Sequence, residues 1–185
     1  MKFLASVLVT ILGFAVAALI VMYSGAVSVS VLDKPSAFQS WILSTTMENS
    51  VNSRAGDITV PDLEKEVMIE TGATHYVTMC QTCHGAPGVN LSAMARGLEP
   101  IPPLLYHKEE AEEWSAAEKF WITKNGIMMT GMPSWGVTHS DEEIWAIVAF
   151  LQKLPGLSEA KYKTMTQSTK TESGHSHADG DGHSH

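Results

Sequence analysis

The sequence is poor in cysteine and in positive charge, and both shortages exclude some classes of function. Its 185 residues include only two cysteines, and 12 Lys and Arg stand against 20 Asp and Glu, which gives a net charge of −8. Such an acidic chain does not favour nucleic acid as a partner, but it suits docking on a basic surface of another protein. Two cysteines are also too few for a four-cysteine zinc site.

Long apolar runs are absent except at the N-terminus. Residues 3–22 carry no charge and as a helix would span about 30 Å, the thickness of a hydrocarbon core. A cleaved signal peptide is the alternative, although the apolar part of such a peptide is typically about 7 to 15 residues long. We expect a single-pass anchor in the inner membrane, with Lys2 on the cytoplasmic side and the remainder of the chain in the periplasm or outside.

Composition divides the chain into four zones, and no internal repeat is visible. The boundaries that we expect are a transmembrane anchor over 1–23, a connector with a short juxtamembrane helix over 24–62, a compact domain over 63–157 and a polar, disordered tail over 158–185.

The compact domain shows helical patterns. Leu63 to Cys80 and Glu112 to Lys124 have helical spacing, and a third helix opens at Ser140 with a capping box. In the first of these helices Gly72 has no side chain, so we expect the last helix to approach it closely. The long Gly- and Pro-rich loop between the first two helices is typical of a segment that packs around a bound group.

Both cysteines belong to one short motif, Cys80-Gln81-Thr82-Cys83-His84. C-x-x-C-H is typical of covalent haem attachment, in which two thiols add to the haem vinyl groups and the next imidazole reaches the iron. A disulfide between Cys80 and Cys83 would close a very small loop and stabilise little. A thioredoxin-like redox pair is also disfavoured, because it requires a βαβ context and the pattern here is helical.

Three groups of residues resemble single-haem class I c-type cytochromes. They are Tyr76-x-x-x-Cys80-x-x-Cys83-His84-Gly85, then Gly131-Met132-Pro133-x-Trp135-Gly136, and then the last helix with Trp145. The resemblance covers about 63–157 and is strongest to membrane-tethered members grouped with cbb3-type oxidase subunits. It implies an all-α cytochrome c fold, one covalent haem c, and electron transfer rather than enzymatic catalysis.

A sixth iron ligand has to come from elsewhere in the chain. Met132 matches the distal ligand of the family, and it lies between Gly131 and Pro133, where glycine permits close approach and proline fixes the turn. Met128 and Met129 are its rivals, with core packing as their other interpretation.

Other residues are candidates for the haem environment. In the family a proline carbonyl orients the proximal imidazole, and Pro103 is the nearest match, although a merely stiff loop would also explain it. Trp135 matches a family position near the haem and could equally be a core aromatic. His107 or His139 as distal ligand would give a bis-His site of lower potential.

Half of the histidines lie near the C-terminus, at His175, His177, His183 and His185. Such a tract can chelate copper, nickel or zinc, or it can be a solvated tail without a metal.

The sequence therefore predicts an electron carrier whose partners are redox proteins, in a respiratory complex or a dehydrogenase. A peroxidase-like haem enzyme would need an open sixth position on the iron, and a metal-responsive haem protein would use the tail as its receptor. Both remain alternatives.

Overall fold

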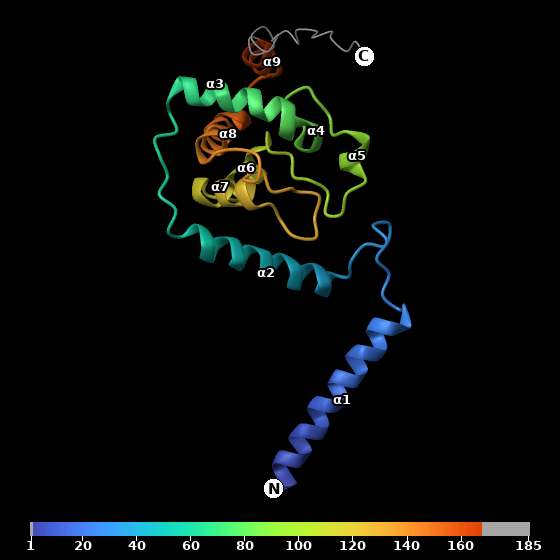
Figure 1. The fold of residues 1–185 in the computed structure, drawn as a ribbon. Helices are drawn as coiled ribbons and strands as arrows, with labels where there is room; N and C mark the ends of the chain where they lie inside the picture. Colours follow the sequence, from blue (N-terminus) through green and yellow to red (C-terminus); the bar gives the residue numbers. More distant parts are fainter. Residues whose placement is uncertain (1, 168–185) are drawn as a thin grey trace, which may run out of the picture. The chain divides into compact units, whose positions relative to one another are not determined.

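The computed structural model describes residues 2–167 of the chain, which fall into two units divided after Ser36 (Figure 1). The first unit contains helix α1 (Lys2–Ser24), whose residues are all exposed. It is the one helix within 2–167 that is long and apolar enough to cross a membrane, and it lies near the N-terminus, where signal sequences also occur.

The second unit is built from helices, and its described part contains no β-strand. Its elements are α2 (Ala37–Ala55), α3 (Glu66–His75), the π-helical turn η1 (Tyr76–Cys80), α4 (Gln81–His84), α5 (Ala93–Arg96), α6 (Lys108–Glu112), α7 (Ala116–Asn125), α8 (Asp141–Lys153), the 3-10 turn η2 (Leu154–Gly156) and α9 (Glu159–Gln167). The predicted all-α class is confirmed.

The centre of this unit is the packing of α8 against α3 (Figure 1). One face of α8 is fully buried, including Ile147 and Phe150. A Cβ atom placed on Gly72 of α3 would overlap the backbone carbonyl of Ala146 and press on the Cβ of Phe150. The expected close approach at Gly72 is therefore present, and only glycine fits there.

Serine caps set where the helices begin. Ser140 and Glu143 form the predicted capping box of α8. A second box joins Ser115 to Glu118, so the helix expected over 112–124 begins at Ala116 as α7, and Glu112 is instead the last residue of α6. The Ser115 hydroxyl accepts a hydrogen bond from the backbone amide of Glu118, and this cap starts α7 at Ala116. The preceding helix, α6, ends at Glu112.

Two segments differ from the zones drawn on composition. Helix α2 packs against α7, and its Val51 and Ala55 are buried, so the connector contributes to the domain. Helix α9 occupies the start of the tail that was expected to be disordered, and its Tyr162 is 2% exposed. The hydroxyl of Tyr162 donates a hydrogen bond to the side-chain oxygen of Gln81. The expected onset of disorder at 158 is therefore wrong, because Tyr162 and Thr166, four residues apart, bury one helix face.

Candidate haem site

The C-x-x-C-H motif lies where the first helix of the domain changes its winding. The chain runs from α3 through the π-helical turn, which ends at Cys80, into α4, which ends at His84. Single π-helical turns are often found at functional sites. Cys80 is buried and Cys83 is partly buried, and both thiols are free. The two cysteine side chains and the imidazole thus all project from one short helical segment.

His84 is oriented by a carbonyl, as expected from the sequence. Its Nδ1 lies 2.8 Å from the backbone oxygen of Pro103. A carbonyl can only accept, so Nδ1 carries the proton and Nε2 keeps a lone pair for a metal. Burial, the largest cause, lowers the pKa of His84, while the Pro103 carbonyl and Glu110 raise it. A neutral imidazole with one defined tautomer suits axial ligation of iron.

The turn that supplies this carbonyl is itself held in place. The backbone amide of Leu104 donates to the carboxylate of Glu110, which lies at the start of α6. Sequence reasoning missed Glu110, because a loop-to-helix contact six residues apart leaves no periodic pattern. With this contact the Pro103 carbonyl has a fixed position opposite His84.

The residue after the motif is fixed by a buried tyrosine. Gly85 has a φ of 66°, a conformation that favours glycine. Its carbonyl accepts a 2.7 Å hydrogen bond from the hydroxyl of fully buried Tyr76. The chain therefore leaves the motif along a defined path beside Leu104 and Tyr106.

Replacing Tyr76 with phenylalanine removes this hydrogen bond and leaves the Gly85 carbonyl without its partner. We expect the free energy of unfolding to fall by about 1–2 kcal/mol, measured by guanidinium denaturation of the full chain in detergent. Tyr106→Phe is the matched control, because it also removes a tyrosine hydroxyl but not the one that bonds the Gly85 carbonyl. Equal losses in the two variants would contradict the assigned role of Tyr76.

Cys80 does not have the environment of a reactive redox cysteine. Burial, with a further contribution from Cys83, raises the pKa of Cys80 to about 12. Thioredoxin-like pairs instead depend on a cysteine with a lowered pKa. The environment of Cys80 is suited to a sulfur that is covalently bonded in the finished protein.

The three methionines considered as distal ligand differ in exposure, and the assignment of Met132 stays a prediction. Met132 is partly buried, whereas Met128 and Met129 are 89% and 93% exposed. The Met132 backbone is fixed on both sides: its amide donates to the Thr130 hydroxyl at 3.1 Å, and its carbonyl accepts from Ile127 at 3.2 Å. The loop thus holds Met132 in a defined turn.

Gly131 brings this loop against the segment that follows the haem motif. A Cβ atom on Gly131 would meet the side chain of Leu98 at 2.6 Å. Leu98 follows α5, whose N-cap Ser92 donates its backbone amide to the carbonyl of Thr82 within the motif. The Met132 loop and the C-x-x-C-H segment are therefore joined through one intervening loop.

The remaining aromatic and histidine candidates have other contacts. The ring of Trp135 meets His139 edge to face at 5.6 Å, and His139 meets His75 in the same way at 5.4 Å. His107 is the N-cap residue of α6, and its ring contacts Tyr106. The distal-ligand alternatives His139 and His107, like the role of Trp135 next to the haem, stay predictions.

The His75 side chain makes stability depend on pH. Burial, the largest cause, lowers the pKa of His75 below 6.5, with Glu143 opposing and His139 adding to the shift. Below about pH 6.5 the unfolded chain therefore binds more protons at this position than the folded one, and acid favours unfolding. We expect the fall in unfolding free energy between about pH 6.5 and 5 to be smaller in His75→Asn than in the wild type, by guanidinium denaturation. Identical slopes would contradict this.

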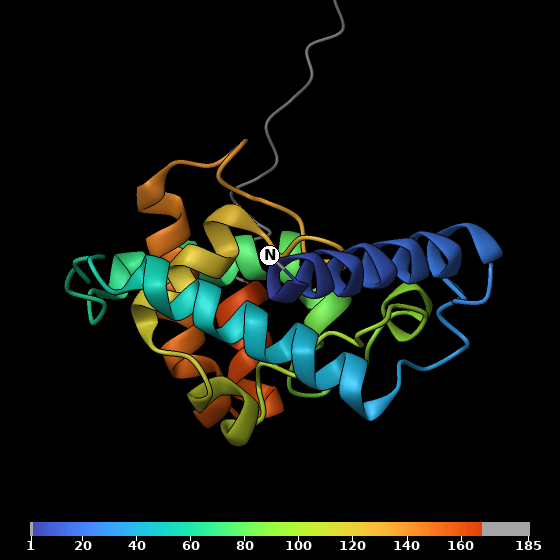
Figure 2. The same ribbon diagram turned by 90° about the horizontal axis from the view of Figure 1, so that it is seen from below.

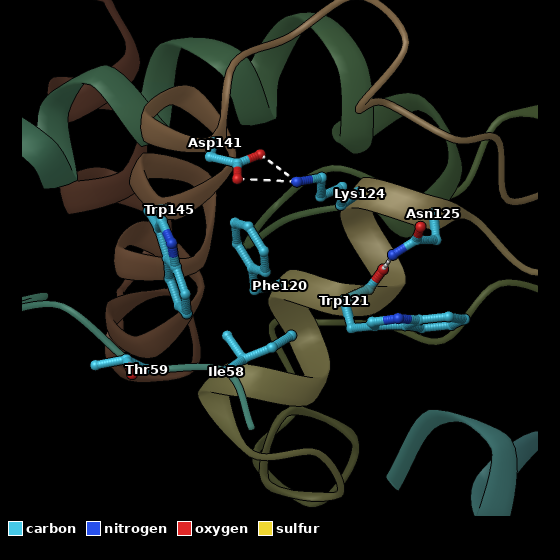
Figure 3. Close-up of a pocket in the computed structure, with 8 residues that line it drawn as sticks. All are labelled: Ile58, Thr59, Phe120, Trp121, Lys124, Asn125, Asp141 and Trp145. Carbon is cyan, nitrogen blue, oxygen red and sulfur yellow. Dashed lines mark hydrogen bonds and ion pairs between the residues drawn. The ribbon is translucent and has the colours of Figure 1, made fainter. Parts of the chain in front are cut away.

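A surface hollow of about 490 Å³ lies apart from the motif (Figure 3). Trp145 stacks on Phe120 at 4.1 Å, and Lys124 pairs with Asp141 at 2.6 Å, so its walls are held by ordinary structural contacts. Its lining includes no residue of the C-x-x-C-H motif and not Met132. Trp121 and Trp145 both line this hollow, and Trp145 also packs against the buried cluster of Phe120, Ile144 and Val148.

The fold and the motif together define a c-type cytochrome domain, and comparison with known proteins agrees. Residues 67–151 match the family described as cytochrome c oxidase, cbb3-type, subunit III. The chain is also 30% identical over 97 residues to cytochrome c550 of Pseudomonas aeruginosa, which covers 51% of this chain and 61% of that protein. The chain thus spans about three fifths of the length of this curated relative.

These matches confirm the c-type cytochrome class, the cytochrome c fold and haem c as the covalent cofactor. They favour electron transfer over enzymatic catalysis, and that activity stays a prediction for this chain. The donor set fits the cofactor, because the two thiols would bond to haem c and the tautomer-fixed imidazole would bind its iron, while Met132 as sixth ligand stays a prediction. The histidines of the tail lie outside the described residues, so their metal binding stays a prediction.

Proposed function

We propose that the chain carries single electrons through a haem c bonded to Cys80 and Cys83, with His84 and Met132 as axial ligands. The observation that carries the proposal is the 2.8 Å contact between His84 Nδ1 and the Pro103 carbonyl. It directs the other ring nitrogen to the metal and fixes the imidazole plane.

When bound, the haem supplies a one-electron couple between Fe(III) and Fe(II). The residues of the chain set the polarity around the haem and its reduction potential. Buried Cys80 and the helices around Tyr76 keep the surroundings apolar, and a Met132 thioether gives a higher potential than a second imidazole would. With both axial positions held by the chain, no substrate has to bind the iron.

The proposed location is the outer face of the inner membrane. Helix α1 supports a single span with the haem domain exported to the periplasm, where c-type domains are matured. The description of the matched family names an oxidase subunit, which supports a respiratory complex as partner, and a dehydrogenase is the other class considered. The acidic net charge of −8 suits a basic partner surface.

Carbon monoxide separates this proposal from a haem enzyme. The reduced full chain at neutral pH should bind carbon monoxide slowly or not at all, because Met132 occupies the sixth position. Stopped-flow absorption measures this directly. Rapid binding would overturn the Met132 ligand and restore the peroxidase-like alternative.

A further inference from the structure

The first turns of α2 expose a group of large apolar side chains. Phe38 and Trp41 are 66% and 61% exposed, and their rings stack at 6.0 Å. Ile42 and Leu43 are exposed beside them. We call Phe38, Trp41, Ile42 and Leu43 the α2 patch. Exposed apolar groups of this size commonly mark a membrane or protein contact.

The α2 patch carries no charge and belongs to a rigid element. No Asp, Glu, Lys or Arg occurs from residue 35 to residue 47. The same helix packs against α7 (Figure 2), and Val51 and Ala55 in its other half are buried. A partner that held the patch would therefore hold the whole haem domain.

The chain itself brings the α2 patch to a lipid surface. Helix α1 ends at Ser24 and α2 begins at Ala37, so residues 25–36 allow a reach of at most about 40 Å. This linker exposes further apolar side chains, namely Val27, Val29, Val31 and Leu32. If α1 spans the bilayer, the α2 patch is confined close to the surface of that bilayer.

We infer that the α2 patch inserts into the lipid interface of the membrane that α1 spans, and so fixes the orientation of the haem domain. The inference rests on the proposed membrane anchor. Trp, Phe and Leu side chains are among those found at the boundary between acyl chains and water. The lack of charge argues for lipid rather than for an ionic protein surface, so the contact persists at high salt.

The test is linear dichroism of the haem band in oriented phosphatidylcholine multilayers that contain the full chain. The wild type should be dichroic, equally at low salt and in about 1 M salt, where charge interactions are screened. Phe38→Ser combined with Trp41→Ser should lose at least about half of this dichroism, because the polar side chains no longer insert. Phe38→Leu combined with Trp41→Leu should retain it.

The matched control is Val67→Ser, since Val67 is an equally exposed apolar residue on α3. It should leave the dichroism unchanged, and unchanged haem absorption should show that every variant is folded. An isotropic wild type, or full dichroism in the double serine variant, would overturn the lipid contact alone. Isotropy in pure lipid would point to a protein surface as the partner. A chain that washes off the multilayers would overturn the anchor and the inference together.

Discussion

Alanine at position 132 is expected to lower the reduction potential by on the order of 0.1 V, a fraction of the roughly 0.8 V that axial ligands span in haem proteins. The reason is that a thioether ligand stabilises Fe(II) relative to harder donors, and Met132→Ala leaves the position to water or another side chain. Equilibrium redox titration of the full chain measures the shift. The weak thioether-to-iron band at the red end of the oxidised spectrum should vanish with it.

Met128→Ala is the matched control, because Met128 lies in the same loop and is 89% exposed. It should keep both the potential and the band. The opposite pattern, with the band lost in Met128→Ala and kept in Met132→Ala, would overturn the ligand assignment. Loss of the band in both variants would show that the loop conformation, and not one sulfur, was disturbed.

Gly72→Ala is expected to destabilise the folded domain by about 3 kcal/mol, at the upper end of the usual cost of overpacking. The added Cβ overlaps the backbone of Ala146, and a backbone atom in a buried helix cannot move aside as a flexible side chain can. Separation of α3 from α8 would relieve the overlap at the expense of buried contacts around Phe150. Guanidinium denaturation followed by circular dichroism measures the loss.

Gly156→Ala provides the comparison, since a Cβ atom on Gly156 meets nothing within 4 Å. Its effect should stay within about 0.5 kcal/mol. If Gly72→Ala were equally mild, the close approach of the two helices would not be a determinant of stability.

The parts of the site that were predictable from sequence are those encoded by short, local patterns. The C-x-x-C-H spacing alone indicates haem attachment, and the Ser140 capping box alone places the start of α8. The Gly72 contact was also predictable, because a glycine within the apolar face of a helix removes the side chain that would keep a second helix at a distance.

The parts that were missed depend on contacts between distant segments. Glu110 reaches back to Leu104 from another element, and the Ser115 cap divides a stretch whose composition is helical throughout. The sequence of α9 is so polar that it gives almost no sign of a buried face. Its buried residues, Tyr162 and Thr166, are recognised only from the packing of α9 against α3. Side-chain periodicity cannot report such tertiary partners.

The contact between Tyr162 and Gln81 joins residues 81 positions apart, and Gln81 lies between the two cysteines. It can form only after nearly the whole domain has been synthesised. Once it has formed, Cys80 is enclosed, with 7% of its surface exposed. Because Tyr162 packs in the same buried cluster as Cys80, docking of the C-terminal helix closes the surroundings of the motif only after the rest of the domain has been made.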